Sequence, residues 1–214
     1  MRKVNLLIKR LGDILASGLG MILLCIPFAL ISLWIKLTSK GPVFFRQERL
    51  GKGGKTFRIF KFRTMVVNAE KTGDGLFVYG NNVSRITSAG RVLRTTSLDE
   101  LPQLLNVLKG DMSIVGPRPP VVYFPYDGYQ NYPEWAKKRF SMRPGITGLA
   151  QVRTRTTAPW DERIVIDNEY VDRFSVALDL KILVQTAVSV LKHQNVYPES
   201  AEQINNNPGH SDKA

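Results

Sequence analysis

An adjacent pair of carboxylates, Asp99 and Glu100, is the part of this 214-residue sequence whose residue types best suit chemistry. Arginines lie on both sides of the pair, with Arg91 and Arg94 before it and Arg118 after it. The N-terminus of a helix, where we expect the pair to lie, attracts phosphate. A carboxylate there can act as a nucleophile or hold Mg²⁺, while arginines neutralise charge on a transferring group. The pattern therefore indicates phosphoryl chemistry.

The same residues also allow a purely structural interpretation. Ser97 and Glu100 have the spacing of a capping box, and Asp99 would complement the helix dipole. Pro102 argues against this, because with Ser97 as N-cap the proline falls at the fifth helical position, where it disrupts the helix. A helix that begins nearer Asp99 accommodates Pro102 but leaves Glu100 outside the box. The residues alone leave both interpretations open.

The composition restricts the partners and the metal chemistry. Thirty lysines and arginines against eighteen acidic residues give a net charge of +12. This charge indicates an anionic partner, either nucleic acid, acidic lipid headgroups or a phosphorylated substrate. The single cysteine, Cys25, excludes a disulfide framework and a cysteine-rich zinc site, and two histidines argue against a histidine-ligated metal. A metal bound here should be a hard cation with oxygen ligands.

The elements that position the acidic pair begin with residues 14–35, which contain no charged side chain. As a helix this run would reach about 33 Å, roughly the thickness of the bilayer hydrocarbon. It is longer than the apolar core of a signal peptide, and no small-residue cleavage site follows it. Pro27, just past the middle, favours a kink. The run therefore predicts a membrane segment.

Basic residues flank this membrane segment on both sides. Residues 1–13 carry four lysines and arginines against Asp13, and residues 36–63 carry nine against Glu48, a net charge of +8. The positive-inside rule places both flanks on the cytoplasmic side, where each basic residue near an anionic surface contributes about 1 kcal/mol. A re-entrant helix kinked at Pro27 satisfies both flanks, and a single-pass anchor is the alternative. Either topology puts the polar part of the chain in the cytoplasm.

The rest of the chain predicts one hairpin and several helices. Residues 41–67 alternate apolar and polar positions around a glycine-rich turn at 51–54, which predicts a β-hairpin with a basic face. A helical pattern from Thr87 breaks near Ser97. A second helix follows, with leucines at 101, 104, 105 and 108 and a C-terminal Gly110. Residues 160–192 predict one or two amphipathic helices.

Aromatic residues gather in residues 123–140. Such a cluster fits an interfacial belt that contacts lipid headgroups. An aromatic mini-core inside the domain is the alternative interpretation.

Several segments occur in an order that is typical of one protein family. They are Asp13 after Lys9-Arg10, Phe60–Met65, Ser97–Gln103, Leu108–Ser113, Gly116–Pro119 and Arg143–Val152. In this order they resemble the bacterial sugar transferases, the monotopic phosphoglycosyl transferases that begin glycoconjugate assembly on a polyprenol phosphate. The resemblance runs from about residue 9 to residue 190. It is closest to the short form of the family, without the additional N-terminal transmembrane helices of larger relatives.

The resemblance and the residue patterns together predict an α+β protein in three parts. Residues 1–38 would form the re-entrant membrane helix kinked at Pro27. Residues 39–192 would form a compact, mostly helical catalytic domain with a small β-hairpin, on the cytoplasmic face of the bacterial inner membrane. Residues 193–214 have the composition of a disordered tail.

The resemblance implies a defined reaction. Similar enzymes convert a UDP-sugar and undecaprenyl phosphate into undecaprenyl-diphospho-sugar and UMP, with Mg²⁺ on the phosphate oxygens. By the match, Asp99 would be the nucleophile of a ping-pong scheme with a covalent aspartyl phospho-sugar, and would also hold the metal. Glu100 would accept a proton from the lipid phosphate or help to place Mg²⁺. The sequence does not name the sugar, the oligomeric state or the pathway, which is lipopolysaccharide, capsule, exopolysaccharide or protein glycosylation.

The resemblance also assigns phosphate binding to basic residues, namely Lys61, Arg63, Arg94, Arg118 and Arg155. Two positions depart from the family pattern. Ile26 stands where a serine often precedes the kink proline, which affects the angle of the kink. Thr154 stands where glycine is usual, which affects the shape of the loop and thus the role of Arg155.

A membrane-anchored basic scaffold that binds acidic lipids or nucleic acid is the alternative function. It requires neither Asp99 nor Glu100, and it predicts salt-dependent binding to any polyanion. The basic residues are not interleaved with aromatic residues in a nucleic-acid-binding face, and the acidic pair would have no purpose. The transferase hypothesis therefore predicts no nucleic-acid partner.

Overall fold

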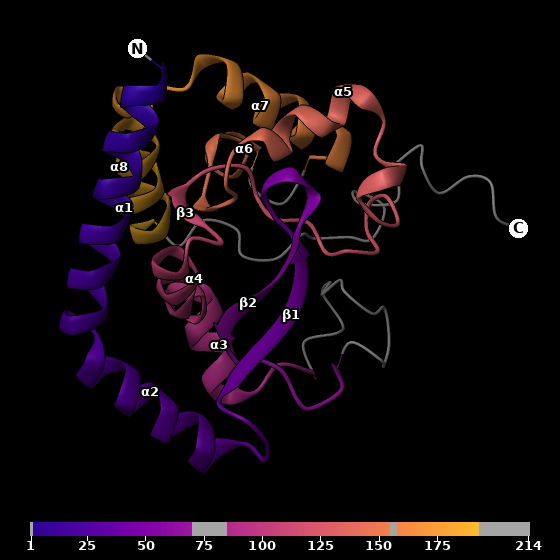
Figure 1. The fold of residues 1–214 in the computed structure, drawn as a ribbon. Helices are drawn as coiled ribbons and strands as arrows, with labels where there is room; N and C mark the ends of the chain where they lie inside the picture. The colour runs from indigo at the N-terminus through magenta and orange to yellow at the C-terminus, as the bar shows by residue number, and fades with distance from the viewer. Residues whose placement is uncertain (1, 70–84, 155–157, 193–214) are drawn as a thin grey trace, which may run out of the picture.

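The computed structural model describes residues 2–69, 85–154 and 158–192, and it mixes helices with two small sheets (Figure 1). The helices and strands are, in chain order, α1 (Arg2–Leu23), α2 (Cys25–Thr38), β1 (Phe44–Leu50), β2 (Thr56–Phe62), α3 (Ser88–Thr95), α4 (Leu104–Lys109), β3 (Ser113–Val115), α5 (Glu134–Lys137), β4 (Gly145–Thr147), α6 (Leu149–Thr154), α7 (Trp160–Arg173) and α8 (Val176–Leu191). Short 3₁₀ helices are η1 (Lys52–Gly54), η4 (Leu98–Gln103), η5 (Tyr129–Asn131) and η6 (Lys138–Ser141). This mixture agrees with the predicted α+β class. The predicted tail, residues 193–214, lies outside the described residues.

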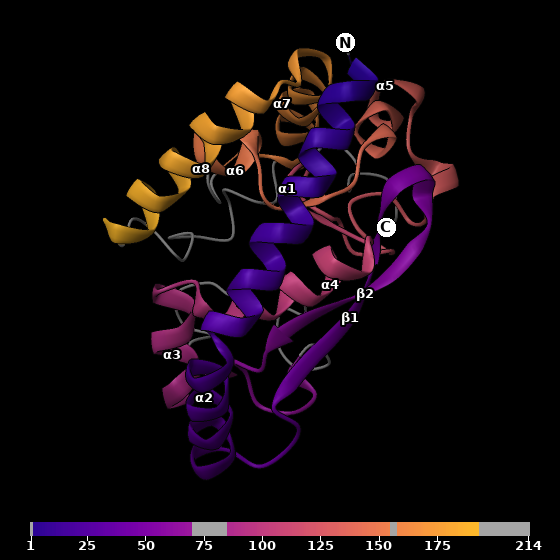
Figure 2. The same cartoon turned by 60° about the vertical axis from the view of Figure 1, so that its left-hand side comes forward.

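The N-terminal apolar run forms two helices with a sharp bend between them (Figure 2). In the described part of the chain, only the pair α1–α2 is long and apolar enough to cross a membrane, and it is bent by 61°. The bend lies at Leu24, three residues before the predicted position. Pro27 explains this offset, because a proline ring clashes with the carbonyl four residues earlier, here that of Leu23, and donates no hydrogen bond to it.

Polar side chains of α1 fix this helix to the rest of the protein. The carboxylate of Asp13 accepts hydrogen bonds from the Ser113 hydroxyl at 2.7 Å and from the Ile114 backbone N–H at 3.0 Å, at the start of β3. Arg10 donates to two backbone carbonyls of α4. Asp13 is buried, so its two partners offset the cost of its desolvation. The first half of α1 is therefore docked on the domain.

The second helix of the bent pair, α2, packs against the helix that leads to the acidic pair. Ile35 of α2 forms an apolar cluster with Phe62 of β2 and with Ala89 and Leu93 of α3. All four side chains are fully or almost fully buried. This cluster places α3 directly beside α2.

The predicted hairpin is confirmed. β1 and β2 pair antiparallel from Phe44 opposite Phe62 to Leu50 opposite Thr56. Gly53 and Gly54 have φ values of 66° and 75°, which glycine adopts without strain. The turn residues thus fix the register, and the register decides which hairpin side chains face the acidic pair.

The two open questions about the C-terminal half are also answered. Part of the aromatic cluster forms a mini-core, because Tyr132 and Phe140 are buried with Leu50 and Ile164 and their rings make edge-to-face contacts. Tyr123 and Trp135 of the same cluster are exposed. Residues 160–192 form two helices, α7 and α8, and the Ser175 hydroxyl accepts the Leu178 backbone N–H to begin the second. Two further clusters belong to the core, one between β3, α6, α7 and α8 and one formed by Ile59, Val107 and Met112.

The close approach of α3 to the end of β2 makes a testable prediction. A Cβ at Gly90 would overlap the backbone carbonyl of Thr64, whereas a Cβ at Gly12 of α1 meets nothing within 4 Å. Gly90→Ala should therefore destabilise the protein by about 1–3 kcal/mol. Gly12→Ala should be neutral or stabilise it by about 0.5–1 kcal/mol. Thermal unfolding in detergent measures both, and equal melting temperatures would contradict the packing.

Candidate functional site

The acidic pair lies on the 3₁₀ helix η4, which is separated from the end of α3 by two residues. α3 ends at Thr95, and Ser97 then adopts a left-handed conformation with φ of 57°. The predicted break near Ser97 is confirmed. The capping-box interpretation is wrong, because the Ser97 side chain makes no capping hydrogen bond. Pro102 accounts for the tighter geometry, and the α-helical part begins only at Leu104.

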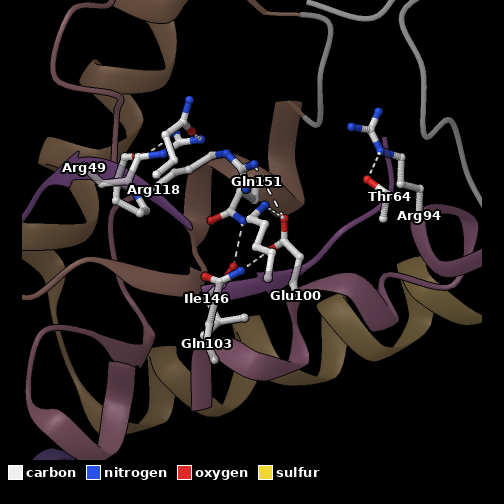
Figure 3. A network of polar contacts seen from close by, with 11 residues as sticks. Arg49, Thr64, Arg94, Glu100, Gln103, Arg118, Ile146 and Gln151 are labelled. Atoms are coloured by element: carbon white, nitrogen blue, oxygen red, sulfur yellow. Dashed lines mark hydrogen bonds and ion pairs between the residues drawn. The ribbon is translucent and has the colours of Figure 1, made fainter. Parts of the chain in front are cut away.

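Glu100 is held by three side chains from three segments (Figure 3). The Lys61 ammonium of β2 lies 2.6 Å from its Oε1. The Gln103 amide donates to Oε2 at 3.2 Å, and the Arg118 guanidinium lies 3.6 Å from Oε1. Burial alone raises the pKa of Glu100, but the charges of Lys61 and Arg118 and these hydrogen bonds outweigh it and lower the pKa to about 2. Glu100 is therefore a fixed anion at neutral pH.

Asp99 has the opposite character. Burial raises the pKa of Asp99 to about 6, with a further contribution from the charge of Glu100 and an opposing one from Lys61 and Arg94. Within the described part of the chain, its carboxylate makes no ion pair and no hydrogen bond with another side chain. A carboxylate that is more basic than usual and not held by neighbours is suited to nucleophilic attack.

A small cationic recess adjoins Glu100. Arg49, Lys61 and Arg118 are among its lining residues, together with Gln103 and Pro119. Three cationic side chains against Glu100 make phosphate a suitable occupant.

Two residues of this site were missed by the sequence analysis. Arg49 lies on the basic face of the hairpin, but the alternation of the strand did not indicate which arginine turns towards Glu100. Gln103 follows Glu100 by three residues, a spacing that brings side chains together on a helix and that could have revealed it.

Two of the other residues predicted to bind phosphate, Arg94 and Arg63, are not among the residues that line this recess. Arg94 donates to the Thr64 hydroxyl at 2.9 Å and is close enough for its charge to act on Asp99. Arg63 is buried, and its guanidinium donates to the backbone carbonyls of Ser39 and Lys40 after α2. In this arrangement Arg63 fixes the end of α2. Arg155 lies outside the described residues.

The donor set for a metal is small. The described residues contain no group of three or more histidine, cysteine or acidic side chains that would form a complete metal site. Mg²⁺ is usually held by one or two carboxylates together with substrate phosphates. Asp99 fits such a site, because Glu100 is already occupied by Lys61 and Gln103.

Comparison with known sequences identifies the family. The profile of the family described as bacterial sugar transferase matches residues 4–193. The chain belongs to this family. The chain is 44% identical over 196 residues to the UDP-glucose:undecaprenyl-phosphate glucose-1-phosphate transferase of Caulobacter vibrioides. This match covers 88% of the chain and 72% of the relative. The sequence-based assignment to the family is therefore confirmed.

Other relatives differ in length and in the sugar that their names state. The transferase is 42% identical over 195 residues to the uncharacterized sugar transferase EpsL of Bacillus subtilis, covering 89% of this chain and 91% of the relative. It is 39% identical over 204 residues to the undecaprenyl-phosphate galactose phosphotransferase of Salmonella typhimurium. That match covers 89% of this chain but only 42% of the longer relative.

The contrasting states of the two carboxylates predict opposite effects of pH on stability. The pKa of Asp99 is raised from 3.8 to about 6, so its ionisation destabilises the fold above pH 6 and has no effect below about pH 4. Asp99→Asn should therefore raise the melting temperature at neutral pH and lose this advantage near pH 4.

Glu100 provides the matched control. Its pKa is lowered from 4.5 to about 2, so the carboxylate stabilises the fold above pH 4.5, and this contribution is lost as the pH falls towards 2. Glu100→Gln should lower the melting temperature at neutral pH. Thermal unfolding of both variants across pH tests the assignment, and a neutral-pH melting temperature that falls for Asp99→Asn would contradict it.

Proposed function

We propose that this protein transfers a sugar-1-phosphate from a UDP-sugar to undecaprenyl phosphate, giving undecaprenyl-diphospho-sugar and UMP. The names of the relatives from Caulobacter vibrioides and Salmonella typhimurium support the reaction class. The observation that carries the proposal is the carboxylate of Asp99, which has a raised pKa and next to it, at Glu100, a recess lined by three cationic side chains. Both substrates are anionic, which accounts for the net charge of +12.

In the first half-reaction the Asp99 carboxylate attacks the β-phosphorus of the donor. A bond forms between Asp99 and the β-phosphorus, and the bond from the β-phosphorus to the bridging oxygen breaks, so that UMP leaves with both bonding electrons. Lys61 and Arg118 lie where they would neutralise charge on the phosphates. Protonation of Asp99 below about pH 6 removes the nucleophile.

In the second half-reaction an oxygen of the lipid phosphate attacks the aspartyl phospho-sugar. The new phosphoanhydride bond forms as the bond to Asp99 breaks, which regenerates the carboxylate. Arg94 lies on α3, which packs against the membrane helix α2, and we assign it to the lipid phosphate. Lys61, Arg118 and Arg49 then bind the phosphates of the soluble donor.

Glu100 has a defined part in this scheme. A carboxylate with a pKa of about 2 accepts a proton poorly at neutral pH. Its contacts support a positioning role, in which Glu100 holds Lys61 and Arg118 beside the diphosphate. Mg²⁺, when bound, would neutralise the charge of the diphosphate oxygens, and Asp99 is the residue that we assign to hold it.

The membrane topology belongs to the same proposal. We assign α1 and α2 to a re-entrant hairpin that enters the cytoplasmic leaflet of the bacterial inner membrane and returns to the same face. The exposed leucines and isoleucines of both helices, the bend of 61° and the basic flanks support this topology. The site then lies at headgroup level, where a lipid phosphate is presented. The basic-scaffold hypothesis explains the charge but gives Asp99 and Glu100 no role.

The reaction is tested by supplying membranes with undecaprenyl phosphate and a panel of UDP-sugars, because the relatives are named for glucose and for galactose. UMP should be released with at least one donor. Asp99→Asn should abolish this release, whereas Asp127→Asn, on an exposed loop, should leave it unchanged. Without acceptor lipid, mass spectrometry should find a phospho-sugar adduct on Asp99. Near-normal UMP release by Asp99→Asn would overturn the nucleophile assignment.

The re-entrant topology is tested with accessible tags at both termini. Both tags should be accessible from the cytoplasm, and the C-terminal tag serves as the internal reference. Pro27→Leu restores a hydrogen-bond donor to the Leu23 carbonyl, so the two helices should straighten and part of the population should present its N-terminus on the outer face. An outward N-terminus in the unaltered protein would establish the single-pass alternative.

A further inference from the structure

A buried ion pair joins η6 to α7 outside the acidic site, and no sequence motif predicted it. The Arg139 guanidinium of η6 lies 2.7 Å from the Asp167 carboxylate of α7, and each side chain is only 1% exposed. The same nitrogen of Arg139, Nη2, donates to the backbone carbonyl of Arg118 at 2.5 Å. The pair therefore connects α7 to the segment that carries a phosphate-binding arginine.

That segment, residues 117–120, is held to an unusual degree. Every one of its four backbone carbonyls accepts a hydrogen bond, from the Gly145 N–H, the Arg139 guanidinium, the Arg49 guanidinium and the Leu50 N–H in turn. Its three prolines already restrict the backbone. The backbone position of Arg118 is thus fixed. Its guanidinium lies 3.6 Å from Oε1 of Glu100.

The charges around the pair do not balance. Burial raises the pKa of Asp167 to about 6 in spite of the opposing charges of Arg139, Arg163 and Arg118. Burial also lowers the pKa of Arg163 to about 10, with the charge of Arg118 adding to the effect. The charges of Arg163 and Arg118 therefore act on the same buried carboxylate that is paired with Arg139. A buried ion pair contributes little to stability by itself, so its retention here needs another reason.

We propose that Arg139 and Asp167 form a positioning device, which fixes the backbone of Arg118 so that its guanidinium meets a phosphate of the UDP-sugar donor. The proposal rests on the proposed function. Neither residue touches substrate, and both act through Arg118. Misplacement of a binding group by about 1 Å can reduce turnover about 100-fold. A fixed position of Arg118 would therefore matter for the rate of transfer.

The decisive variant replaces the pair by apolar residues. Arg139→Met combined with Asp167→Leu removes both charges together, a change that is often neutral or stabilising for a buried pair. The melting temperature should therefore be kept, while kcat/KM for UMP release should fall between about 10- and 100-fold. The control is the neighbouring exposed pair of Lys138 and Asp172, for which Lys138→Met with Asp172→Asn should leave kcat/KM unchanged.

Single variants separate positioning from simple attraction of the anionic donor. Asp167→Asn removes a negative charge, so attraction alone predicts a lower KM for the UDP-sugar, whereas positioning predicts a higher KM or a lower kcat. Arg139→Lys keeps the charge, but the lysine side chain is shorter and its ammonium does not reach the position of Nη2, which contacts both Asp167 and the Arg118 carbonyl. Positioning therefore predicts that Arg139→Lys does not rescue activity. A lower KM for Asp167→Asn, or full activity of Arg139→Lys, would overturn the proposal.

A double-mutant cycle shows whether the pair acts through Arg118. Arg118→Met in the apolar-pair background should cause little further loss, because Arg118 is already misplaced, whereas independent roles give additive losses. Additive losses overturn the positioning role and leave the proposed function intact. Full UMP release by Arg118→Met alone overturns both the positioning role and the assignment of Arg118 to the donor phosphates.

Discussion

The site depends on the ion pair between Lys61 and Glu100. Adjacent carboxylates that are removed from solvent repel each other and favour protonation. Lys61 lies 2.6 Å from Glu100 and removes most of this penalty for one member of the pair. Asp99, which has no such partner in the described structure, keeps a pKa of about 6. Two carboxylates that are neighbours in sequence thereby acquire different pKa values, which is why we assign the nucleophile to Asp99 and a positioning role to Glu100.

Three separate parts of the fold position the cationic side chains of the site. The hairpin register presents Lys61 and Arg49, and the proline-rich segment presents Arg118. Arg94 comes from α3, which the apolar cluster holds against α2. The hydrogen bonds of Asp13 complete the connection between the N-terminal helix pair and the rest of the protein.

Much of the local structure could be predicted from the sequence, because glycine, proline and apolar periodicity act over a few residues. The glycines at 53 and 54 give the hairpin, and the amphipathic pattern of residues 160–192 gives α7 and α8. Two details differed. The membrane bend lies at Leu24, because Pro27 disrupts the turn before it, and the acidic pair lies on a 3₁₀ helix because Pro102 prevents an α-helix there.

The sequence by itself determined the family, the acidic pair, the apolar N-terminal run and the excess of basic residues. It could not determine which basic residues surround Glu100, because that depends on segments more than fifteen residues apart packing together. Arg49 and Arg118 line the recess, whereas Arg63 binds the end of α2. The different pKa values of Asp99 and Glu100, and the buried pair of Arg139 and Asp167, likewise arise only from burial and proximity in the folded chain. Charge and desolvation act over a few ångströms of space, and only the tertiary structure decides which side chains lie within that range.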